Sequence, residues 1–195
     1  MRKSLAVAVA ALSVAGVGAL VPAAANAACS ASAGCTSATV TLNGNNSIAI
    51  AVPDGSVTPV ALASVSTGAT SASGSLGNVT VTDTRGALPA TWAASAVASN
   101  FTNSTTGGST ANETIAAGNV AYYAGVGTAA VGQVGAFVPT GTVLTPTAIG
   151  TSATVGNWTL GVGNNTVTWN PTISFTLLPS QVAGVYTGTI TQSVS

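Results

Sequence analysis

Short runs in which every second residue is apolar recur along the chain, and they constrain its fold more than any other feature. Clear examples lie at residues 48–52, 79–82 and 172–177, each bounded by Gly, Pro or Asn. A period of two places successive side chains on opposite faces of a β-strand, and strands spaced by about ten residues are typical of antiparallel sandwiches and barrels. The pattern predicts an all-β protein, and we expect an antiparallel, immunoglobulin-like β-sandwich.

Two turn sequences predict β-hairpins. Asn-Gly-Asn-Asn at residues 43–46 separates two alternating runs, and Gly-Asn-Asn at residues 163–165 separates two more. Asn and Gly tolerate the positive φ angles that tight hairpin turns require. The hairpin arms are expected at residues 39–42 and 48–52, and at residues 158–162 and 166–169. Further strands are expected at residues 58–66, 92–99, 121–125, 142–144 and 185–194, with an exposed polar loop at residues 102–112.

The N-terminus predicts export. Two basic residues precede an uncharged apolar segment at residues 5–21, and an Ala-x-Ala cleavage signature follows at residues 25–27. We therefore expect residues 1–27 to be a cleaved signal peptide and residues 28–195 to form one domain. A membrane span and a lipidated Cys29 are weaker alternatives, because the apolar segment is short and an Asn stands where a lipobox carries a Leu-like residue.

Cysteine usage agrees with an exported protein. Cys29 and Cys35 are the chain's two cysteines, and an oxidising exterior favours a disulfide bond between them. A ring this small would stabilise the first segment by only about 2 kcal/mol. Beyond the signal, the sequence has no apolar segment long enough for a transmembrane anchor and no cell-wall sorting motif. Any attachment to a cell surface is therefore expected to be non-covalent.

Charged residues are too few for several classes of partner. Without the signal, Arg85 remains against three acids, Asp54, Asp83 and Glu113, and the chain has no histidine. One cation cannot neutralise a phosphate backbone, so we expect no nucleic-acid partner. A metal site needs more ligands than two cysteines provide. We interpret Asp54, which lies in a Pro-Asp-Gly sequence, as a turn residue.

Catalytic groups are equally scarce. Ser and Thr are abundant, but without a neighbouring base their hydroxyls are weak nucleophiles. Two carboxylates can form a glycosidase pair, so a secreted hydrolase that uses Asp83 or Glu113 is our third and weakest hypothesis. We expect a non-enzymatic protein without a cofactor.

Three tryptophans and two adjacent tyrosines are the candidate contact residues. Trp92, Trp158 and Trp169 lie on predicted strands, where tryptophan usually belongs to the core of a sandwich. The alternative is an exposed aromatic platform for the sugar rings of a wall glycan. Tyr122 and Tyr123 are expected on opposite faces of one strand, and whichever faces solvent could serve in the same way.

The only cation after the signal lies two residues from an acid. We expect Asp83 and Arg85 to form a structural ion pair that pins the turn leading to Gly86, with modest stabilisation if the pair is exposed. The alternative is that Arg85 contacts a ligand.

The sequence VTVTDTRGALPATW at residues 79–92, with VYTGTITQSV at residues 185–194, resembles the WxL-type cell-surface domain of Gram-positive bacteria. The family's Asp-x-Arg-Gly turn before a first Trp matches residues 83–86 and Trp92, and its last strand matches Tyr186 and the threonines that follow. The Ala-, Thr- and Gly-rich composition suggests an actinobacterial relative. The Trp-x-Leu motifs themselves are not at the family positions, and the Trp-Thr-Leu at residues 158–160 lies upstream of the second one.

The resemblance implies a secreted β-sandwich protein that associates non-covalently with peptidoglycan. Our first hypothesis is therefore a non-enzymatic, wall-associated surface protein. The second is a structural subunit that polymerises by strand exchange, as fimbrial subunits do, with residues 185–194 as the exchanged strand. Expected partners are wall glycan, other surface proteins or further copies of the chain.

Overall fold

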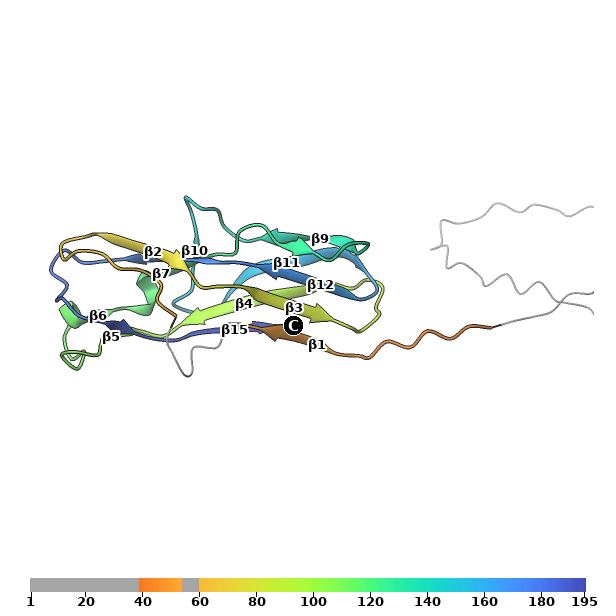
Figure 1. The fold of residues 1–195 in the computed structure, drawn as a ribbon, viewed down its shortest axis with the longest axis horizontal. Coiled ribbons are helices and arrows are strands. Elements are labelled where there is room, and N and C mark those ends of the chain that lie inside the picture. Colours follow the sequence, from red (N-terminus) through yellow and green to blue (C-terminus); the bar gives the residue numbers. More distant parts are fainter. Residues whose placement is uncertain (1–38, 54–59) are drawn as a thin grey trace, which may run out of the picture. The chain divides into compact units, whose positions relative to one another are not determined.

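Antiparallel strands make up nearly all the regular structure of this protein, which is all-β (Figure 1). The computed structural model describes residues 39–53 and 60–195, and the compact unit considered below is Leu42–Ser195. The described residues contain no α-helix, and two short 3₁₀ turns, η1 (Ala111–Glu113) and η2 (Ala117–Asn119), flank β6. The strands are β1 (Ile48–Ala51), β2 (Ser71–Ser75), β3 (Val79–Asp83), β4 (Trp92–Ala98), β5 (Phe101–Asn103), β6 (Thr114–Ile115), β7 (Val120–Tyr123), β8 (Thr128–Ala129), β9 (Val134–Pro139), β10 (Thr147–Ala148), β11 (Ala153–Val162), β12 (Asn165–Trp169), β13 (Thr172–Thr176), β14 (Tyr186–Thr187) and β15 (Ile190–Val194).

One layer consists of two four-stranded sheets that follow one another. Their strand orders are β1-β3-β12-β8 and β10-β7-β13-β2. The chain runs from β2 directly into β3 and from β12 directly into β13, and these strands pair with each other in both sheets. The Leu76 N–H donates to the Pro171 carbonyl at 2.9 Å where the two sheets meet. The two sheets are therefore successive halves of one interrupted layer.

The second layer is built in the same way. Its strand orders are β15-β4-β11-β9 and β14-β5-β6, and β4 runs into β5 as β14 runs into β15. The Ser99 N–H donates to the Thr189 carbonyl at 2.9 Å at this interruption.

The core lies between the layers. β4 buries every second residue from Trp92 to Ala98, and β3 and β12 show the same alternation. The ring of Trp92 stacks on Trp169 of the opposite layer, with centroids 6.3 Å apart, and Phe101 meets Phe175 edge to face at 5.1 Å. Aromatic side chains from both layers thus fill one core, as in a β-sandwich, and the predicted fold class is confirmed.

Small residues make room for the large rings. Gly135 in β9 has φ 133°, and a Cβ atom there would overlap the indole of Trp158. A Cβ on Gly156 would overlap the ring of Phe137. The close approach of these backbones to aromatic rings explains why glycine occurs within β9 and β11.

The first predicted hairpin is wrong. Residues 39–47 form no strand, Leu42 is 92% exposed, and β1 pairs with β3 instead of with the preceding segment. The Asn45 N–H donates to the Thr84 carbonyl at 2.8 Å, which continues this alignment past the end of β3. Pairing with β3 lets the isoleucines of β1 pack against the core, and a local hairpin would bury much less apolar surface.

The second predicted hairpin is also wrong. β11 and β12 belong to different layers, and the turn between them, with Gly163 at φ 69°, carries the chain across the sandwich. The turn sequence predicted the reversal correctly, but it does not determine whether the next strand pairs in the same sheet.

Of the remaining strand predictions, two are wrong, and β2 is among the strands that were missed. Residues 60–66 and 142–144 are not strands, and Leu144 is 92% exposed. β2 was not predicted, because its sequence SASGS has no large apolar residue, yet all five of its residues pair with β13. Tyr122 points inward and Tyr123 outward, as expected for neighbours on one strand.

The burial of all three tryptophans predicts a distinct fluorescence signature. Trp92, Trp158 and Trp169 are 4%, 1% and 2% exposed. We expect emission at shorter wavelength than free tryptophan, little quenching by iodide, and a shift to longer wavelength only on unfolding. Iodide quenching as strong as that of free tryptophan would contradict this core.

Candidate functional site

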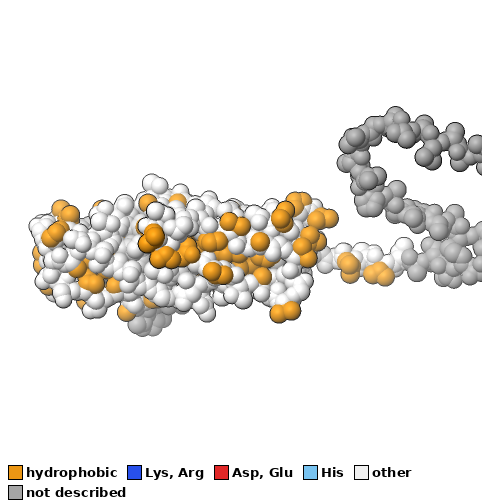
Figure 2. Space-filling view, turned by 90° about the horizontal axis from the view of Figure 1, so that it is seen from above, with side chains coloured by type: hydrophobic (Ala, Val, Ile, Leu, Met, Phe, Trp, Pro, Cys, Tyr) orange, Lys and Arg blue, Asp and Glu red, His pale blue; other side chains and the backbone are white. Residues whose placement is uncertain are grey.

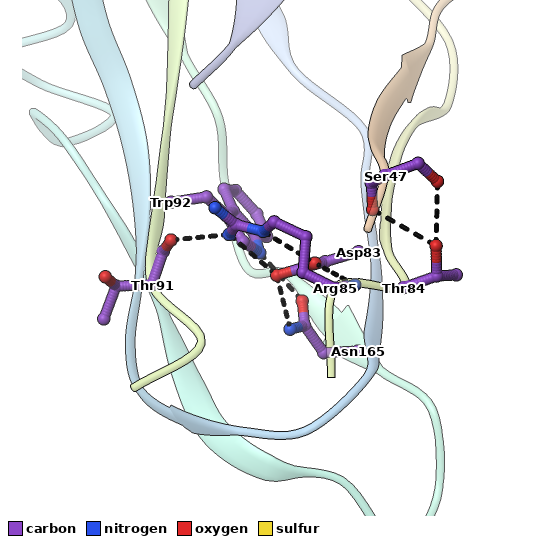
Figure 3. A network of polar contacts seen from close by, with 7 residues as sticks. All are labelled: Ser47, Asp83, Thr84, Arg85, Thr91, Trp92 and Asn165. Carbon is purple, nitrogen blue, oxygen red and sulfur yellow. Dashed lines mark hydrogen bonds and ion pairs between the residues drawn. The ribbon is translucent and has the colours of Figure 1, made fainter. Parts of the chain in front are cut away.

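The Asp83 carboxylate is the centre of a polar network at the end of β3 (Figure 3). Asp83 is fully buried, whereas the Arg85 side chain is 28% exposed. Arg85 donates from Nε to Asp83 Oδ1 at 2.9 Å and from Nη2 to Oδ2 at 2.8 Å, and its backbone N–H donates to Oδ1 at 3.0 Å. Paired N–H donors matched to two carboxylate oxygens are the strongest arrangement available to this ion pair.

The network continues into both layers. The Asn165 side-chain amide donates to Asp83 Oδ2 at 3.3 Å, and Trp92 Nε1–H donates to Asn165 Oδ1 at 2.8 Å. Arg85 Nη2 also donates to the Thr91 carbonyl at 2.8 Å. Strands β3 and β12 of one layer are thereby joined to the start of β4 in the other. Asn165 was not recognised from the sequence as more than a turn residue, since an Asn after Gly-Asn carries no signal of burial.

Two glycines allow the turn to close. Gly86 has φ 63°, in the left-handed region that favours glycine. A Cβ on Gly44 would clash with the Arg85 carbonyl oxygen. The segment before β1 can therefore lie against this turn only through glycine.

The charges of the network are stabilised in their ionised forms. The hydrogen bonds from Arg85 hold the pKa of Asp83 below its ordinary value, and Asp83 in turn raises the pKa of Arg85. A carboxylate whose pKa is lowered in this way is a poor proton donor or acceptor near neutral pH. The network is therefore suited to a structural role.

Glu113 lies apart from Asp83. It accepts hydrogen bonds from the backbone N–H and the hydroxyl of Thr110 at 3.1 and 2.8 Å, which closes a capping box around η1. Hydrogen bonds from Thr106 and Thr110 lower its pKa. β6, which follows Glu113, and the end of β3 lie at opposite ends of the sandwich in Figure 1, so the two carboxylates do not flank a common site.

The tryptophans belong to the core, as the sequence favoured, and the alternative of an exposed glycan platform is wrong. The Trp92 ring stacks between Trp158 and Trp169, at 6.3 Å from each, and all three are buried. Tyr122 is equally enclosed: its hydroxyl accepts from Trp169 Nε1–H and donates to Gln192 Oε1, both at 2.8 Å. Burial raises the pKa of Tyr122. These rings are core residues, and Gly135 and Gly156 shape the core around them.

Tyr186 has a structural role as well. Its half-buried ring packs against the core, and its hydroxyl lies 2.7 Å from the Val182 carbonyl and 3.0 Å from that of Asn112. It ties the last part of the chain to the loop before β6.

Among the five candidate contact residues, Tyr123 alone faces outward, and its ring lines a groove. It projects from the outer face of β7 beside the outward-facing side chains of β13 and β2, where Thr172 pairs with Tyr123 and Ser174 pairs with Ser73. The groove has a volume of about 470 Å³. It is lined by Val65, Ser71, Ala72, Ser73, Tyr123, Val143, Pro146, Thr172 and Ser174.

The chemistry of the Tyr123 groove is neutral and amphipathic. Five of its lining residues carry hydroxyl groups, which donate and accept hydrogen bonds, and none is charged. The tyrosine ring adds a flat apolar surface with a polar end. Four apolar residues, Val65, Ala72, Val143 and Pro146, complete the wall. Such a groove fits a ligand that presents both apolar faces and many hydroxyls.

A second depression lacks such a ring. It has a volume of about 450 Å³ and lies over β4, β9 and β11 near Asn157 and Thr159. Trp92 and Trp158 border it, but at 4% and 1% exposure neither offers a ring face. We therefore regard the Tyr123 groove as the candidate site.

No protein-family model, curated protein or solved structure matches the chain. Within residues 39–53 and 60–195, no three His, Cys, Asp or Glu side chains gather to hold a metal ion, and no helix is long and apolar enough to cross a membrane. The predicted signal peptide, the predicted Cys29–Cys35 disulfide and Asp54 lie outside the described residues.

Removing the cation should destabilise the fold. In Arg85→Ala the buried Asp83 carboxylate loses its main partner, and we expect the free energy of unfolding to fall by about 3 kcal/mol. Urea titrations of wild type, Arg85→Ala and Arg85→Lys measure this, with the lysine variant intermediate because it keeps the charge but loses the paired geometry. A change within 0.5 kcal/mol, the usual range of surface substitutions, would show that the pair is dispensable.

The lowered pKa of Asp83 predicts acid sensitivity. An unfolded Asp titrates at about 3.9. As the pH falls below this value, the unfolded state takes up the proton more readily than the folded state, so stability is present above about pH 4 and is lost on further acidification. Urea titrations between pH 6 and 2 should show this loss in wild type. In Asp83→Asn, which has no carboxyl at this position, the loss should be markedly smaller, and an unchanged pH profile would contradict the prediction.

Proposed function

We propose that this chain is an exported, non-enzymatic cell-surface protein that associates non-covalently with cell-wall glycan through the Tyr123 groove. The carrying observation is the groove itself, with one outward-facing, half-buried tyrosine among uncharged hydroxyl-bearing residues. The signal-like N-terminus and the resemblance to WxL-type domains support a surface location.

The chemistry of a glycan matches this groove. A sugar ring has apolar C–H faces, which can stack on Tyr123, and a rim of hydroxyls, which can exchange hydrogen bonds with Ser73, Thr172 and Ser174. The groove has no cation to attract an acidic wall polymer. Binding through it is therefore expected to depend only weakly on salt concentration.

Assembly by strand exchange is the second candidate. A donor strand must leave its own sheet, yet β14 pairs with β5 and all five residues of β15 pair with β4. Exchange would have to break these pairings first. The folded arrangement therefore favours the glycan-binding proposal.

A sedimentation assay with purified peptidoglycan sacculi tests the proposal. Wild type should sediment with the sacculi at both low and high salt. Tyr123→Ala should weaken binding about tenfold, which corresponds to about 1.4 kcal/mol, whereas Tyr123→Phe keeps the ring and should retain most of the binding.

A control variant and two contradicting outcomes complete the design of the assay. Leu88→Ala is a matched control, because Leu88 is 79% exposed and lies outside the groove. Wild type that stays entirely in the supernatant would overturn the function. Full binding by Tyr123→Ala would leave wall association intact and overturn the assignment of the groove.

A further inference from the structure

β15 is an edge strand with an unused backbone face. It pairs with β4 on one side and has no strand on the other within the described residues. Ala93 and Ser195 exchange both backbone hydrogen bonds, at 2.9 and 3.1 Å. Because bonded and non-bonded pairs alternate in an antiparallel ladder, Thr191 and Ser193 also bond to β4. The N–H and C=O groups of the intervening residues, Ile190, Gln192 and Val194, consequently point to the open edge.

This edge carries none of the features that usually prevent strand pairing. Natural edge strands are commonly short or carry a charge, a proline or a bulge. β15 has five residues in unbroken register with β4, and its sequence ITQSV contains neither charge nor proline. The outward side chains, Thr191 and Ser193, are exposed, small and neutral.

Most other edges in the described part of the chain are protected. β9, at the far side of the same sheet, ends at Pro139, has Gly135 at φ 133° and faces a register shift in β11. β2 is an exception, because the Leu62 carbonyl lies against its inner face at Gly74 and its edge, like that of β15, has neither charge nor proline. Pro53 follows shortly after the four-residue β1. The remaining edge strands, β6, β8, β10 and β14, have two residues each.

We propose that the open edge of β15 pairs with β15 of a second copy of this chain. An antiparallel pairing centred on Gln192 is self-complementary, so each protomer offers the same donors and acceptors to the other. Thr191 would lie opposite Ser193 of the partner subunit, a pairing of neutral hydroxyl side chains. The four-stranded sheet would continue into an eight-stranded sheet across the dimer. This interface goes beyond the proposed glycan binding and does not depend on it.

The charge distribution favours a second copy as the occupant. Asp83 and Arg85 neutralise each other, which leaves Glu113 as the one uncompensated charged side chain of the described residues. On the face drawn in Figure 2 no charged side chain is visible. Copies of this unit therefore meet little electrostatic repulsion, and a strongly charged partner would find no complementary group on β15. β1 lies beside β15 at the same edge of the sandwich, so the same two-fold axis would bring two copies of β1 together and enlarge the interface (Figure 1).

Charge reversal tests this pairing directly. The double variant T191K/S193K places lysine opposite lysine across the proposed interface, and T191E/S193E places glutamate opposite glutamate. Wild type should sediment as a dimer in analytical ultracentrifugation. Either variant alone should have a dissociation constant raised about tenfold or more. An equal mixture of the two should recover dimers, because each lysine then faces a glutamate.

The controls separate the interface from folding. S152K/T154K carries two lysines at the same spacing and similar exposure, at the start of β11 away from the edge, and should remain dimeric. Recovery of dimers in the mixture cannot come from misfolded chains. A wild type that stays monomeric at near-millimolar concentration, a T191K/S193K variant as dimeric as wild type, or a mixture that stays monomeric would each overturn the proposal.

Discussion

A buried carboxylate is the constraint on which the rest of this structure depends. An unpaired charge at the position of Asp83 would cost several kcal/mol, so its oxygens must be occupied. Arg85 supplies the N–H groups of Nε and Nη2, Asn165 supplies its side-chain NH₂, and the oxygen of the same amide accepts the indole N–H of Trp92. The hydrogen bonds that satisfy the Asp83 carboxylate therefore extend through Asn165 to Trp92 and hold its ring in place. Trp158 and Trp169 stack on that ring.

The sequence was most informative where apolar and polar residues alternate or a tryptophan begins the run. β3, β4, β12 and β13 bury every second side chain, and all four were predicted close to their observed bounds. β2 was not predicted, because its Ser, Ala and Gly residues are all small and show no alternation between large apolar and polar side chains. It is a strand because it pairs with β13, which lies about a hundred residues later in the sequence. Both hairpins failed for a related reason: a turn sequence sets the backbone of a few residues, whereas the burial of whole strands decides which strands pair.

The candidate site could be predicted only in part. Alternation on β7 placed one tyrosine outward, and the structure shows that it is Tyr123. The hydroxyls around it come from strands about fifty residues apart on either side, so no local pattern contains the groove. The lack of charge, by contrast, is visible in the composition alone. Because the groove has no charged residue, hydrogen bonding and shape would have to provide most of the affinity for any ligand.

The interruptions in both layers separate the candidate groove from the charge network along the sandwich. The Tyr123 groove belongs to the half built from β2, β7 and β13, and the Asp83–Arg85 pair belongs to the half built from β3, β4 and β12. Substitutions at distant sites that share no partners are nearly additive in free energy. Substitutions in the groove can therefore accumulate without loss of the charge network that holds the layers, so the surface chemistry of one half can change while the scaffold of the other is kept.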